Sequence, residues 1–174
     1  MVVDRASDVC TPMRHSATYG ALVQDVFGLE HNRCQVPTDS GHITFSVDQR
    51  DQLWSEHAES PFPEAAEAVD AAVRQYKAEY DAISGSSGGS GAGASDLRNA
   101  INVLPELTDR KRVIDQHLTV CQALLTAIKE RHLGDLFALE QRLERGSVLS
   151  FLNSSGTGAS GNVEDKCRLY VIYC

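Results

Sequence analysis

The fold is decided by residues 96–131, which read DLRNAINVLPELTDRKRVIDQHLTVCQALLTAIKER. Their apolar side chains recur at spacings near three and four, which is the pattern of an amphipathic α-helix. These positions are Leu97, Ile101, Leu104, Leu107, Ile114, Leu118, Cys121, Leu125 and Ile128. Pro105 interrupts the pattern. Because proline has no backbone N–H and its ring clashes with the preceding turn, we expect the helix to kink or restart there.

A second helical pattern precedes this stretch. The sequence SPFP at residues 60–63 breaks the chain, and apolar side chains then recur on neighbouring turns from Pro63 to Ile83. Residues 84–95 are almost entirely Gly, Ser and Ala, a composition that buries little apolar area and is typical of a flexible linker. The two patterns and the linker together predict a helical hairpin with arms over 63–83 and 96–131.

The remaining patterns predict shorter elements. They are a helix over 17–29 that ends near Gly28, a strand over 42–47, a helical turn capped by Asp48, a helix over 135–145 closed by Gly146, a loop over 153–161 and a last helix capped by Asn162. The first three residues, Met-Val-Val, indicate the end of a buried strand. We therefore expect a mainly α domain with a protruding helical hairpin and a minor β element.

The charge of the chain limits its partners. The formal net charge is −8, with 14 acidic and 6 basic residues in positions 1–93 and 10 of each in positions 94–174. This balance disfavours nucleic acid and anionic membranes, because both are bound by clustered cations. No apolar run approaches the roughly 20 residues that a membrane span requires, so we expect no direct membrane insertion. The acidic first half favours a cationic partner.

The cysteines indicate a reducing compartment. They are odd in number and irregularly spaced, and no signal peptide accompanies them, so we expect reduced thiols in the cytosol that serve mainly as packing groups. They are Cys10, Cys34, Cys121, Cys167 and Cys174.

No catalytic or metal-binding constellation is evident. The six histidines are not paired with one another or with cysteine at a metal-ligand spacing. A G-x-S-x-G match at residues 85–89 lies inside the Gly/Ser tract rather than at a strand-to-helix turn, so it gives a hydrolase almost no support. We expect no catalytic residues, no metal and no cofactor. The remaining interpretations of the fold are a helical bundle and a helix-binding module. Each residue of the apolar stripe could then belong either to the core or to a surface that binds a partner.

The opening of the chain resembles the strongest signature of the SM (Sec/Munc) family of SNARE chaperones. The matching pattern is Asp4-Arg5-x-x-Asp8-x-x-Thr11-Pro12-x-x-His15-x-x-x-Tyr19. Later stretches resemble the Sly-type, ER-to-Golgi branch of that family. They are SPFPE at 60–64, LPEL at 104–107 with Arg110-Lys111 and Ile114-Asp115, IKER at 128–131 with Leu133, and EDK at 164–166 with Arg168-Leu169. The resemblance covers essentially the whole chain.

The resemblance implies that residues 1–174 are the domain called 3a in that family. Residues 1–16 would be the end of a central-domain strand and the connecting signature, 63–131 the hairpin with its linker at 84–95, and 135–174 the C-terminal helices. In the family, the hairpin is a template that holds SNARE motifs in helical register, chiefly the R-SNARE, with Qa-SNARE (syntaxin) helices as a further partner. The Gly/Ser tract replaces a longer lid loop, which puts lid-based autoinhibition in doubt.

The site residues that the resemblance implies lie on the second arm of the hairpin. Leu107, Ile114 and Leu118 are the candidates for the SNARE-binding face, Lys111 is the candidate for pairing with acidic SNARE positions, and Pro105 is the candidate hinge. We expect Ile114 and Leu118 to be partly exposed and to act together as the central SNARE contact. For the apolar candidates the competing interpretation is packing against the other arm. We expect a non-enzymatic monomer in the cytoplasm, peripheral at ER and Golgi membranes. The alternative function is a helical tethering scaffold that binds a partner other than a SNARE.

Overall fold

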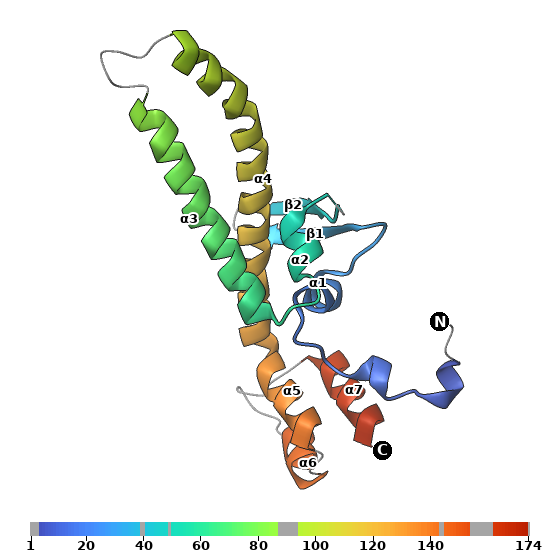
Figure 1. The fold of residues 1–174 in the computed structure, drawn as a ribbon. Helices are drawn as coiled ribbons and strands as arrows, with labels where there is room; N and C mark the ends of the chain where they lie inside the picture. Colours follow the sequence, from blue (N-terminus) through green and yellow to red (C-terminus); the bar gives the residue numbers. More distant parts are fainter. Residues whose placement is uncertain are drawn as a thin grey trace. The chain divides into compact units, whose positions relative to one another are not determined.

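A computed structural model of the chain describes residues 4–38, 41–48, 50–86, 94–142, 145–153 and 162–173, and these are mainly helical (Figure 1). The helices are α1 (Tyr19–Phe27), α2 (Gln52–His57), α3 (Phe62–Ser86), α4 (Ala94–Arg131), α5 (Leu133–Arg142), α6 (Arg145–Asn153) and α7 (Val163–Tyr173). Two strands, β1 (Arg33–Thr38) and β2 (Gly41–Ser46), and two 3-10 turns, η1 (Arg5–Ser7) and η2 (Thr11–Met13), complete the described elements. The mainly α class with a minor β element is confirmed.

The chain divides into two compact units. One comprises Thr18–Ala123, and the other combines Met1–Ala17 with Leu124–Cys174. We call them the hairpin unit and the terminal unit. Helix α4 contributes residues to both, because the division falls at Leu124.

Helices α3 and α4 form the two predicted arms within the hairpin unit. Both begin and end within a few residues of the ranges expected from apolar periodicity. Pro105 lies inside α4, which continues through it without restarting. Figure 1 shows α3 beside the first half of α4, whose yellow-green first turns bend away from the axis of the rest of the helix. Residues 87–93 of the predicted linker lie outside the described residues.

The two strands pair as an antiparallel hairpin in the same unit. Arg33 lies opposite Ser46 and Val36 lies opposite Ile43. The alternation of apolar residues predicted β2, whereas β1, which contains Pro37, was not predicted. Proline is tolerated there because both strands of a two-stranded sheet are edge strands, and the N–H groups along the outer edge of such a strand need no partner in the sheet.

Helix α2 begins at a different cap from the one predicted. The Oδ1 atom of Asp51 accepts a hydrogen bond from the backbone N–H of Trp54 at 3.2 Å, which makes Asp51 the N-cap. Asp48 instead accepts from the N–H of Arg50 at 3.0 Å in the turn before the helix. The prediction that Asp48 caps this helix is therefore wrong. Both carboxylates precede the apolar pair at Leu53 and Trp54, and only the tertiary contacts of Asp51 distinguish them.

The terminal unit contains one helix more than the sequence predicted. Gly146 does not close α5, which ends at Arg142, but lies inside α6. Its effect as a helix breaker is overridden, since glycine costs a helix interior only about 1 kcal/mol relative to alanine. The predicted cap of the last helix is confirmed, because the Oδ1 atom of Asn162 accepts from the N–H groups of Glu164 and Asp165. The predicted strand at residues 1–3 and residues 154–161 of the predicted loop lie outside the described part of the chain.

Candidate binding surface on helix α4

The inner face of α4 is fixed by a buried chain of hydrogen bonds. The Nε2 atom of His117 lies 2.7 Å from Oδ2 of Asp51, and Nδ1 lies 2.8 Å from the hydroxyl oxygen of Tyr19. Because a carboxylate only accepts, Nε2–H of His117 donates a hydrogen bond to Asp51, and in the tautomer with its hydrogen on Nε2 the Nδ1 atom accepts from the hydroxyl of Tyr19. The chain joins α1, α4 and the cap of α2.

Burial and hydrogen bonding act on the Asp51 carboxyl in opposite directions. Burial disfavours its charged form, but the hydrogen bonds from His117 and from the backbone N–H of Trp54 outweigh burial and lower the pKa of the carboxyl. Burial raises the pKa of Tyr19 well above its ordinary value. Tyr19 and His117 are buried, with relative exposures of 1% and 0%. Because these two side chains are buried, their contacts fix the position of α4.

Aromatic rings surround the imidazole of His117. Phe45 meets it edge to face with ring centroids 5.2 Å apart, and Tyr19 lies at 5.9 Å. Trp54 packs against both Phe45 and Tyr19, at 5.8 and 5.5 Å. These contacts give the single tryptophan a packing role, although its side chain is only half-buried. The aromatic cluster therefore holds the middle of α4 in one orientation.

Two of the four predicted contact residues are buried. Leu107 is 6% exposed and Ile114 is 4% exposed. They lie seven residues apart and continue to Cys121, so all three fall on the seam of α4 that also carries His117. Burial raises the pKa of the Cys121 thiol to about 11, in keeping with its predicted packing role. The expectation that Ile114 is partly exposed is wrong, since the core-facing seam of α4 is wider than sequence spacing could reveal.

The other two predicted residues are exposed. Leu118 is 37% exposed, and Lys111, seven residues before it on the same face, has its Nζ atom 3.9 Å from Oδ2 of Asp115. Lys111 also lines a shallow hollow of about 400 Å³ beside Ile43 of β2. Helix α4 therefore presents an apolar side chain and a cation together to solvent. Pro105 is exposed on the same helix.

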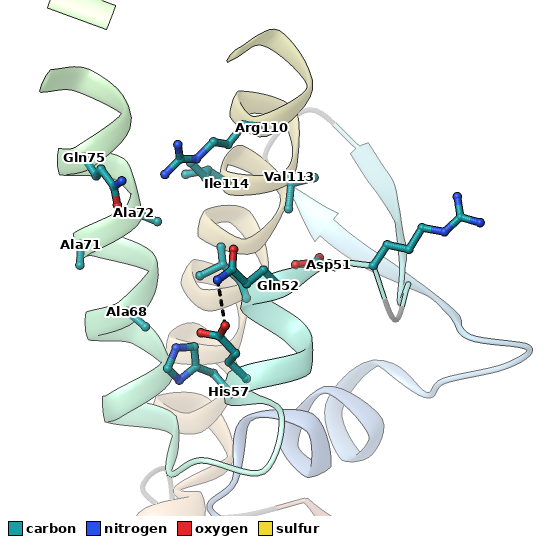
Figure 2. A pocket seen from close by; sticks show the side chains of 13 residues that line it. Asp51, Gln52, His57, Ala68, Ala71, Ala72, Gln75, Arg110, Val113 and Ile114 are labelled. Carbon is teal, nitrogen blue, oxygen red and sulfur yellow. Dashed lines mark hydrogen bonds between the residues drawn. The ribbon is translucent and has the colours of Figure 1, made fainter. Parts of the chain in front are cut away.

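A groove that was not predicted from the sequence lies between the arms. Figure 2 shows Ala68, Ala71 and Ala72 of α3 facing Val113 and Ile114 of α4. The cavity has a volume of about 460 Å³ and is closed at one side by α2. The alanines recur at helical spacing, and this small-residue stripe was the signal that could have revealed it.

An ion pair bridges the two arms beside this groove. The Nη1 atom of Arg110 lies 2.8 Å from Oε2 of Glu79, and both side chains are about two-fifths exposed. An exposed pair of this kind contributes roughly 0–1 kcal/mol. The buried contacts of α4, rather than this pair, therefore determine its position.

The described residues hold no group of histidine, cysteine and carboxylate side chains that could bind a metal ion. Within the same part of the chain, no helix is long and apolar enough to cross a membrane. The G-x-S-x-G match continues beyond Ser86 into residues that the structure does not describe.

Comparison with known proteins gives a consistent assignment. The model of the Sec1 family matches residues 1–174. The chain is 35% identical over 99% of its length to "Protein sly1" of Schizosaccharomyces pombe, and 33% identical over 99% to "Sec1 family domain-containing protein 1" of Homo sapiens. It spans 29% of the first protein and 32% of the second.

Solved structures agree with this assignment. The crystal structure of Sly1p in complex with an N-terminal peptide of Sed5p matches 98% of this chain and 27% of its own, with 30% identity and a TM-score of 0.77. The SM protein Vps45 in complex with the Qa SNARE Tlg2 shares the fold, with a TM-score of 0.81 at 20% identity. The chain therefore belongs to the Sec1 family, and Sly1 proteins are among its relatives.

Proposed function

We propose that this chain binds helical SNARE segments along the exposed face of α4 and thereby promotes SNARE complex assembly in vesicle fusion. The observation that carries the proposal is the exposure of Leu118 on a helix whose adjoining face is anchored by buried His117. A SNARE motif must lose conformational entropy to become helical, so a rigid, preformed surface lowers the cost of ordering it.

The contact surface that we propose is narrower than the predicted one. Leu118 supplies apolar area and Lys111 supplies a cation for acidic positions of the partner, while Leu107 and Ile114 support the surface from beneath. We propose the R-SNARE as the principal partner and Qa-SNARE helices as a further one. Family membership supports this choice, as do the relatives solved with a Sed5p peptide and with a Qa SNARE.

The proposed work is recognition, in which no covalent bond is made or broken. Similarity to Sly1 proteins favours ER-to-Golgi transport, with the chain acting in the cytoplasm at the surface of these membranes. The acidic balance of the chain is compatible with attachment through a protein partner rather than through anionic lipid.

The test is direct binding of R-SNARE peptides to the wild-type chain and to Leu118→Lys. The introduced charge must be desolvated on binding, so we expect at least about a tenfold loss of affinity, equivalent to about 1.4 kcal/mol. The melting temperature should stay near the wild-type value because the position is exposed. Leu149→Lys is the matched control, since Leu149 is an exposed leucine on α6; it should bind like the wild type.

Two results would contradict the proposal. One is a Leu118→Lys variant that binds as tightly as the wild type. The other is a wild-type chain that binds no peptide from a panel of SNARE motifs, which would favour a scaffold for a different partner.

A further inference from the structure

A histidine is enclosed between two carboxylates inside the terminal unit. His15 is 6% exposed, Glu140 of α5 is 2% exposed and Asp165 of α7 is fully buried. The Nδ1 atom of His15 lies 2.6 Å from Oε1 of Glu140, and Nε2 lies 3.2 Å from Oδ1 of Asp165. The backbone N–H of His15 also donates to Oε2 of Glu140 at 2.9 Å.

This geometry requires one proton more than a neutral imidazole and two carboxylates can supply. A neutral ring has a single N–H, whereas both ring nitrogens of His15 face oxygens that only accept when ionised. Either the ring is an imidazolium, or one carboxyl keeps a proton and donates it to the ring. In either case, Glu140, His15 and Asp165 together hold one additional proton.

The arginine side chains around this cluster contact Asp165. Arg131 of α4 donates to both carboxylate oxygens of Asp165, with Nε 3.0 Å from Oδ2. The Nη1 atom of Arg168 lies 3.9 Å from Oδ1 of the same carboxylate. The carboxylate of Glu140 instead meets the ring and the backbone N–H of His15, and the hydroxyl of Tyr173 donates to the backbone carbonyls of Leu139 and Glu140. Loss of the proton would therefore leave the buried Glu140 carboxylate facing a lone pair of the ring.

We propose that this cluster is a proton-dependent clasp, in which one bound proton fastens the segment before α1 to helices α5 and α7 and its release as the pH rises loosens that segment. The clasp links positions 125 and 150 residues apart in the sequence. It provides the terminal unit with a means of responding to cytosolic pH that does not depend on any SNARE partner.

The direction of the pH dependence follows from the linked ionisations. Burial by itself lowers the pKa of His15, but the hydrogen bonds and charges of Glu140 and Asp165 outweigh it and raise the pKa above the ordinary 6.5. Burial also opposes ionisation of Asp165, yet Arg131 and His15 lower the pKa of that carboxyl. The contribution of His15 is therefore complete below pH 6.5 and is lost as the pH rises through its raised folded-state pKa.

The experiment follows the His15 imidazole by nitrogen-15 NMR in the whole 174-residue chain between pH 5.5 and 9, with amide hydrogen exchange of residues 8–17 over the same range. We expect the midpoint of His15 to lie above 6.5, with both ring nitrogens protonated at its acidic side. After correction for intrinsic exchange rates, protection of residues 8–17 should fall through that midpoint, by about tenfold for each unit of pKa elevation.

Two variants separate the clasp from general effects of pH. Glu140→Gln keeps the side-chain shape but removes one negative charge, so the His15 midpoint should move toward 6.5 and the fall in protection should shrink with it. His132→Gln is the control, because His132 is an exposed histidine of the same unit that lies 3.3 Å from Asp135. This variant should leave both the midpoint and the fall in protection unchanged.

A His15 midpoint at or below 6.5 in the wild-type chain overturns the proposal, even if Glu140→Gln fails to fold. Protection of residues 8–17 that stays constant through the midpoint also overturns it, as does an undiminished fall in the Glu140→Gln variant.

Discussion

Ile114 is buried, whereas Leu118, one helical turn later on α4, is exposed to solvent. The two side chains project from neighbouring positions of the same face, since residues four apart are stacked on a helix. The boundary between the core of the hairpin unit and its surface therefore passes between them. One residue maintains the fold, and the other remains available to a partner.

Alanine substitutions should reveal this boundary. We expect Ile114→Ala to lower the free energy of unfolding by about 2–5 kcal/mol, because it removes buried methyl groups and leaves a cavity. Leu118→Ala should cost less than about 1 kcal/mol, since its side chain already contacts water. Urea denaturation of both variants on matched preparations measures the difference. Equal losses in the free energy of unfolding at the two positions would contradict a boundary between core and surface at this point of α4.

Pro105 provides a second test, because α4 passes through it without a break. Pro105→Ala restores one backbone donor and removes the ring clash, and alanine is favoured over proline in a helix interior by about 3 kcal/mol. We expect circular dichroism to show a higher helix content. We also expect R-SNARE peptides to bind more tightly, because a straighter α4 offers them a longer continuous helix surface. Glu106→Ala, at the next exposed position, is the control and should change neither. Unchanged helix content together with unchanged affinity would argue against a hinge at Pro105.

Local sequence signals predicted most of the helices. The apolar spacing of α3 and α4, the helix stop at Gly28 and the cap at Asn162 all act within a few residues of the position concerned. Gly28 follows α1 with a φ of 68°, a conformation that glycine adopts without strain. Such signals operate through the backbone of one element and do not require knowledge of its neighbours.

The features that were not predicted depend on distant contacts. Ile114 and Leu118 have the same apolar character, and only the packing of the unit decides which of them is covered. The choice of Asp51 over Asp48 as the cap of α2 coincides with a hydrogen bond that Asp51 accepts from His117, 66 residues away. His15 is part of the family signature, yet nothing in its own neighbourhood identifies Glu140 as its partner.

The cap of α2 can be tested by comparing these two aspartates. Asp51→Ala removes an N-cap, worth about 0.5–2 kcal/mol, and also leaves the buried Nε2–H of His117 without its acceptor. We therefore expect a loss of about 2–4 kcal/mol at neutral pH. Asp48→Ala, an exposed turn residue, should cost less than about 1 kcal/mol. Urea denaturation would contradict the assignment if the Asp48 variant proved the less stable of the two.

We expect the hydroxyl of Tyr19 to contribute to the stability of the fold in addition to the packing of its ring. Tyr19→Phe keeps the aromatic contacts with Trp54 and Phe62, whose ring centroids lie 5.5 and 6.4 Å away, but deprives Nδ1 of His117 of its hydrogen-bond donor. A buried acceptor left unsatisfied costs about 1–3 kcal/mol, so we expect a loss of stability in that range. Tyr80→Phe is the matched control, because Tyr80 is 48% exposed and its stacking on Tyr76 does not use the hydroxyl. The control should unfold at the same urea concentration as the wild type. If Tyr19→Phe also unfolded there, the hydroxyl would contribute nothing, and the orientation of α4 would rest on ring packing alone.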